Sequence, residues 1–90
     1  MSQAIVDPEE LRRFARNLKR LHGELEGQML MLSGQLKSLG QTWRDTEQQK
    51  FADEFERTMQ TISKFLAAIE QHVPFLLRKA DRVEEYLRQR

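Results

Sequence analysis

The chain contains no cysteine, two prolines and four glycines in 90 residues. Without cysteine it cannot form disulfides, thiolate nucleophiles or cysteine-based metal sites. The scarcity of proline and glycine leaves long segments free of helix-breaking residues. A content of 39% hydrophobic and 32% charged residues is typical of long helices. Since no strand-like alternation interrupts the pattern, we predict an all-α fold.

Neither sign of charge dominates, and no long apolar run occurs. Fifteen basic and fourteen acidic residues give a formal charge of +1, so no global field favours nucleic acid or an anionic membrane. No run approaches the roughly 18 apolar residues that suggest a membrane span. The start, MSQAIVDPEELRR, lacks the basic and apolar segments of a Sec signal peptide. We expect no integral membrane segment, and a protein that is cytoplasmic or secreted without a Sec signal.

A first helix is predicted over residues 8–39. Asp7 is a carboxylate N-cap, Pro8 suits the first helical position, and Glu10 can return a bond to the cap. Gly40 is a C-terminal stop. Apolar residues recur at steps of three and four, as in a coiled-coil seam. This stripe comprises Leu11, Phe14, Leu18, Leu21, Leu25, Met29, Leu32, Leu36 and Leu39.

A second helix is predicted over residues 46–88, after a turn at 40–45. Asp45 with Gln48 repeats the capping signature. Pro74 removes the bond to the carbonyl of Glu70, which costs about 3 kcal/mol inside a helix. The stripe stays in phase across Pro74, so we expect a kink, with a hinge as the alternative. The stripe comprises Phe51, Phe55, Met59, Ile62, Leu66, Ile69, Val73, Leu76, Ala80, Val83 and Leu87.

Two long helices joined by a short turn must run antiparallel, which makes residues 1–90 a single helical-hairpin domain. We predict that ten stripe residues form the hairpin seam: Leu18, Leu25, Leu32, Leu36, Phe51, Phe55, Ile62, Leu66, Ile69 and Val73.

More apolar surface is present than one seam can hide. We therefore expect a homodimer, or a heterodimer with a related hairpin, closing into a four-helix bundle. The candidate dimer face comprises Leu30, Met31, Phe65, Ala68 and Phe75.

No set of residues indicates catalysis or metal binding. His22 and His72 lie on different predicted helices, and neither has a second histidine at helical spacing. Adjacent carboxylates such as Glu84 and Glu85 point about 100° apart on a helix, which does not suit shared acid–base work. Neither a nucleophile motif nor a phosphate-binding glycine loop is present. We predict no catalytic residues, no metal, no cofactor and no enzymatic activity.

Basic residues gather on the first turns of the first helix. Acidic residues of the second helix can pair with them, and no aromatic residues interleave for base stacking. A nucleic-acid or membrane-surface binder is therefore a weak third hypothesis. The strip comprises Arg12, Arg13, Arg16, Lys19 and Arg20.

The only tryptophan lies in the turn, within LGQTWRDTEQQKF, and phenylalanines follow eight and twelve residues later. With two amphipathic helices in about 90 residues, this pattern resembles the WXG (Trp-x-Gly) family, the early-secretory-antigen-like proteins associated with type VII secretion. The turn motif is Trp43, Arg44 and Asp45. The resemblance implies hairpins that dimerise into four-helix bundles. It also implies export in folded form, without a cleaved signal peptide, as substrates or as partners of larger secreted proteins, with a secretion ATPase as a further partner.

Two positions depart from the family pattern. Asp45 replaces the glycine of the namesake motif, and a helix N-cap can take over its role there. The family's secretion signal, Tyr-x-x-x-Asp/Glu, would begin at Tyr86 and end at Arg90, which is basic. If the protein is exported, we expect the signal to come from a partner or another surface. The alternative is a cytoplasmic coiled-coil scaffold or adaptor.

Overall fold

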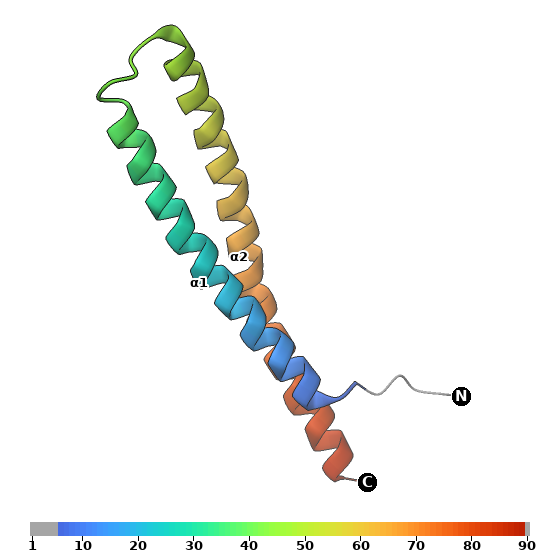
Figure 1. The fold of residues 1–90 in the computed structure, drawn as a ribbon. Helices are drawn as coiled ribbons and strands as arrows, with labels where there is room; N and C mark the ends of the chain where they lie inside the picture. Colours follow the sequence, from blue (N-terminus) through green and yellow to red (C-terminus); the bar gives the residue numbers. More distant parts are fainter. Residues whose placement is uncertain (1–5, 90) are drawn as a thin grey trace.

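Two helices make up the part of the chain that the computed structural model describes, residues 6–89 (Figure 1). α1 spans Pro8–Leu39 and α2 spans Thr46–Arg88. They run antiparallel and form a rod that measures 68 × 22 × 15 Å. The predicted all-α antiparallel hairpin is confirmed. The first five residues and the last residue of the predicted domain lie outside the described range.

Each helix begins at an aspartate whose side chain caps a backbone amide. Asp7 accepts from the amide of Glu9 at 2.9 Å, and Pro8 occupies the first helical position, where no donor is needed. Asp45 accepts from the amide of Gln48 at 2.9 Å. Asp45 has φ −88° and ψ −175°, an extended conformation open to any residue. The backbone therefore does not require glycine at this position, and the aspartate supplies a cap that glycine lacks.

The turn closes by ordinary right-handed backbone. Gly40 has φ −65° and ψ −12°, so the left-handed conformation typical of a C-terminal glycine is not used here. Instead, the amides of Thr42 and Trp43 both donate to the carbonyl of Leu39, at 3.2 and 2.9 Å. These bonds satisfy a carbonyl that the end of α1 would otherwise leave free.

The two helices approach most closely in the half of the rod away from the turn. Ala15 of α1 and Leu66, Ile69 and Ala80 of α2 are the buried apolar residues of the described chain. Ala15 and Ala80 have side chains of one carbon, which lets the two backbones come close together. Most other predicted seam residues, from Leu18 to Val73, are half-buried.

Leu32 and Phe51 differ from the seam prediction, because their side chains are 42% and 45% exposed. Both lie towards the turn, where the rings of Trp43, Phe51 and Phe55 pack in place of the alanines found at the other end of the rod. Large rings hold two helices further apart than alanines do. The seam is therefore narrow and closed near Ala15, and open near the turn.

α2 passes through Pro74 as one unbroken helix. The chain does not break at Pro74, as the prediction of a kink rather than a hinge required, and residues 75–88 continue the helix that begins at Thr46. Val73 and Leu76 are half-buried and Ala80 is buried, so the seam of α2 continues in register across the proline. Their packing against α1 offsets the hydrogen bond that Pro74 cannot donate to the carbonyl of Glu70.

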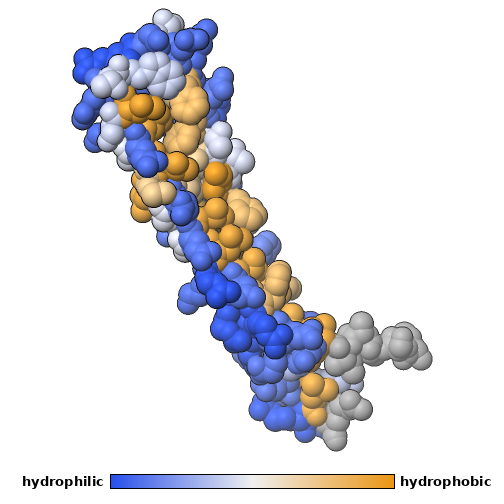
Figure 2. Space-filling model, viewed as in Figure 1, coloured by the Kyte–Doolittle hydropathy of each residue, from blue (hydrophilic) through white to orange (hydrophobic). Residues whose placement is uncertain are grey.

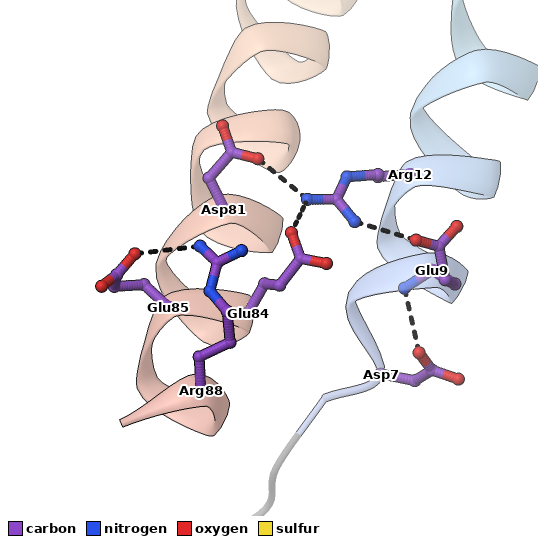
Figure 3. Close-up of polar contacts among 7 residues, drawn as sticks. All are labelled: Asp7, Glu9, Arg12, Asp81, Glu84, Glu85 and Arg88. Atoms are coloured by element: carbon purple, nitrogen blue, oxygen red, sulfur yellow. Dashed lines mark hydrogen bonds and ion pairs between the residues drawn. The ribbon is translucent and has the colours of Figure 1, made fainter. Parts of the chain in front are cut away.

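A network around Arg12 joins α1 and α2 at the end of the hairpin away from the turn (Figure 3). The guanidinium donates to Glu84 at 2.8 Å and to Asp81 at 2.9 Å on α2, and to Glu9 at 2.9 Å on its own helix. The hydrogen bond to Glu84, and to a smaller extent the one to Asp81, raises the pKa of Arg12. The guanidinium is therefore charged in the folded protein. The network fixes the axial register of α1 against α2.

The aspartate cap gives a prediction for the turn. Replacing Asp45 by Ala removes the acceptor for the Gln48 amide and should lower the free energy of unfolding by about 1 kcal/mol, whereas Asp45→Gly should cost only a few tenths. Urea denaturation at one fixed protein concentration measures both. Equal losses for the two variants, or no loss for either, would contradict a capping role.

Candidate interaction surface

Polar groups of the described chain do not assemble a reactive centre. Nε2 of His22 lies 2.9 Å from Oε2 of Glu70 across the two helices, while His72 is exposed and lines a separate hollow beside Phe75. Over residues 6–89, no cluster of three or more histidines and carboxylates could hold a metal ion. The notable feature of the described surface is its exposed large apolar side chains.

Large apolar side chains remain exposed on one side of α1. Phe14 is 57% exposed, and Leu21, Leu32 and Leu39 are also exposed. At about 100° per residue these four positions project within about 20° of one another. Met31, 50% exposed, flanks them.

A matching row runs along α2. Phe51, Phe65 and Tyr86 are separated by 14 and 21 residues, so they share one heptad position. Phe65 is 51% exposed and Tyr86 is 56% exposed. The three rings are spread over nearly the whole length of the helix.

A groove near the turn shows that the two rows belong to one side of the rod. Met31, Leu32 and Leu39 line it from α1, and Phe51 and Phe55 line it from α2. Figure 2 shows one face of the rod, on which apolar side chains form a band that follows the hairpin between polar groups. We call the combined surface the apolar stripe, comprising Phe14, Leu21, Met31, Leu32, Leu39, Phe51, Phe65 and Tyr86.

The predicted dimer face is only partly continuous with this stripe. Met31 and Phe65 belong to it. Leu30, 73% exposed, projects about 160° away from Phe14 around α1 and does not line the groove that contains Met31. Ala68 and Phe75 project about 60° and 80° from Phe65, on the same side as Tyr86. Leu30 therefore lies apart from the rest of the predicted face, and a dimer face that includes Met31, Phe65, Ala68 and Phe75 stays a prediction.

The turn motif lies at one end of the stripe. Trp43 is half-buried, and its ring centroid lies 6.0 Å from that of Phe51, which in turn lies 6.0 Å from Phe55. Nε of Arg44 donates to the carbonyl of Gly40 at 3.4 Å. Trp43 thus packs back on the start of α2, and its neighbour Phe51 contributes to the exposed surface.

The sequence contained a signal for the true orientation of α1. Leu11, Ala15, Leu18, His22, Leu25 and Met29 also recur at steps of four and three, and all are buried or half-buried. A pattern built on large apolar residues alone places Phe14 and Leu21 inward, since alanine and histidine do not count. Both are exposed, because the helix is rotated towards Ala15 and His22.

Solved structures provide close matches to this hairpin. A point mutant of the secreted protein EsxB from Bacillus anthracis str. Sterne matches with a TM-score of 0.83 and 34% identity, covering 94% of this chain and 96% of that chain. A selenomethionine-labelled EsxB matches at 0.80 and 32%, covering 96% and 98%. Wild-type EsxB matches at 0.80 and 34%, covering 92% and 89%.

The sequence matches a protein family, although no curated protein sequence matches the chain. Within residues 6–89, neither helix is apolar enough over a sufficient length to cross a membrane. Residues 3–86 match the family described as WXG100, proteins of 100 residues with WXG. With Trp43 at the turn of an EsxB-like hairpin, the chain belongs to the WXG100 family.

Proposed function

We propose that this protein is a non-enzymatic association module that acts as a type VII secretion substrate or co-secreted partner. In this role it dimerises through the apolar stripe. Family membership and the likeness to the secreted protein EsxB support the secretion role. The exposed stripe supports dimerisation, and it is the observation that carries the proposal.

The core of the single hairpin is too small to account for its order. Four apolar residues are buried in the described chain, and two of them are alanines. Small domains already bury a low fraction of their surface, and ordering each residue costs about 1–2 kcal/mol of conformational entropy. Covering the stripe by a second hairpin would add the missing apolar burial and give a four-helix bundle.

The charge distribution favours a second copy of this chain in antiparallel orientation. Residues 24–69, the turn half, carry a net charge of −2, whereas residues 1–23 and 70–90 together carry +3. Antiparallel pairing places each turn half against the oppositely charged half of the other copy. Charge of this size sets orientation more than affinity, which comes from the stripe.

The same orientation brings aromatic residues together. Phe65 is close to the midpoint of the rod, so the two copies of Phe65 meet near the two-fold axis. Phe51 and Tyr86 lie 14 and 21 residues from Phe65, so Phe51 of one copy comes within about 10 Å along the rod of the level of Tyr86 of the other. Trp43, which packs on Phe51, then holds an interface residue in position and presents the turn at the end of the bundle to a further protein.

A cytoplasmic scaffold that is never exported is the second candidate, and Arg90 favours it. Basic Arg90 stands where the family's Tyr-x-x-x-Asp/Glu signal, counted from Tyr86, has an acid. Under our proposal, recognition for export comes from the partner or from another surface of the bundle.

Charge placed in the stripe should separate the two copies. Phe65→Lys buries an unpaired ammonium twice in a symmetric dimer and should weaken self-association about a hundredfold. Leu30→Lys is the matched control: Leu30 is more exposed than Phe65 but lies outside the stripe, so it should leave the dimer intact. Sedimentation equilibrium from low to high micromolar concentration measures both. A wild-type monomer throughout, or equal effects of the two changes, would contradict the homodimer.

Export is tested in the native cell with and without its secretion ATPase. We expect the protein in the culture supernatant only when the ATPase is present, and we expect Phe65→Lys to reduce its release relative to Leu30→Lys. Retention in the cytosol under both conditions, together with a stable pulled-down partner, would replace the secretion role by the scaffold.

A further inference from the structure

A second groove lies between the helices in the closed half of the rod. It has a volume of about 380 Å³. Its lining comes from both helices and comprises Ala15, Arg16, Lys19 and His22 of α1 and Ile69, Glu70, Val73, Pro74 and Leu77 of α2. We call it the basic-rimmed groove.

This groove faces away from the apolar stripe. Around α1, Arg16 and Lys19 project about 160° and 140° from Phe14, which belongs to the stripe. Around α2, Pro74 projects about 180° from Phe65. A dimer closed through the stripe therefore leaves the basic-rimmed groove open on the outside of each copy.

The floor of the groove is apolar. Ala15 and Ile69 are buried, Val73 is half-buried, and Leu77 is exposed at the edge. Apolar floors of this kind bind apolar side chains, because covering them removes more surface from water.

The rim carries a net positive charge. Within the described part of the chain, the side chains of Arg16 and Lys19 make no hydrogen bond or ion pair. Glu70, the carboxylate of the lining, is engaged by Nε2 of His22 at 2.9 Å. Arg12, by contrast, is already bonded to three carboxylates. The groove thus presents two free cations beside an apolar floor.

The shape of the groove suits a helix. From Ala15 to His22 it extends over seven residues, which is about 10 Å or two helical turns. The two antiparallel helices form its walls, as in grooves that receive the apolar face of an amphipathic helix through positions i, i+3 or i+4, and i+7. A free fatty acid would need a more enclosed site, since small-ligand pockets bury most of the ligand surface.

We propose that the basic-rimmed groove docks about two turns of an acidic amphipathic helix from a partner protein. Its apolar side chains cover Ile69, Val73 and Leu77, and its carboxylates pair with Arg16 and Lys19. This site is separate from the dimer interface, so one dimer can carry two partner helices.

A titration of the isotopically labelled full chain tests this proposal by nuclear magnetic resonance. The probe is a synthetic 14-residue helix, stapled for order, with leucines at positions i, i+4 and i+7 and glutamates on both flanks. We expect saturable shifts confined to residues 15–22 and 69–77. The double variant Arg16→Glu/Lys19→Glu should weaken binding at least tenfold and should favour a probe with lysines in place of the glutamates.

Arg13→Glu/Arg20→Glu is the charge-matched control, because neither residue lines the groove, and it should bind like the unchanged chain. The footprint should also survive in Phe65→Lys, which separates this proposal from dimerisation. Shifts on Met31 and Phe51, or equal weakening by the two double variants, would overturn the proposal. So would the absence of a saturable footprint, or binding to anionic lipid vesicles that needs Arg16 and Lys19 while the peptide does not bind.

Discussion

The structure depends on the contact of α1 with α2 along one narrow seam. Two helices can bury only the residues of each that face the other helix. In the described chain the buried residues of this seam are Ala15, Leu66, Ile69 and Ala80. The apolar residues left over cannot turn inward, because the helix pair has one inside. Eight of them form the apolar stripe, which is why we propose that a second hairpin covers it.

The turn shows how one fold tolerates a change in its namesake motif. Glycine would be required if the third motif residue had a positive φ, but Asp45 has φ −88° and caps α2. Trp43 keeps its place because its ring packs on Phe51, a contact that depends on the spacing between the turn and α2. Family membership therefore persists while the local backbone is stabilised by a different interaction.

Much of the fold could be predicted from the sequence, because caps and apolar periodicity act locally. Asp7, Pro8 and Asp45 mark helix starts through backbone hydrogen bonds that need no tertiary context. The rotation of α1 could not be predicted in the same way. It depends on Ala15, which is buried although its side chain is small, because α2 packs against it from a part of the chain that is distant in sequence. For that reason Phe14 and Leu21 become surface, and Leu30 lies apart from Met31.

A dimer joined through the apolar stripe can be tested by cross-linking, because the chain has no cysteine of its own. Gln28 lies near the middle of α1, 14 residues from Phe14 on the stripe side, and Leu30 points away from it. A short bismaleimide should cross-link Gln28→Cys into covalent dimers at low micromolar concentration and leave Leu30→Cys monomeric. Equal cross-linking of the two variants, or preferential cross-linking of Leu30→Cys, would show that the copies do not meet through the apolar stripe.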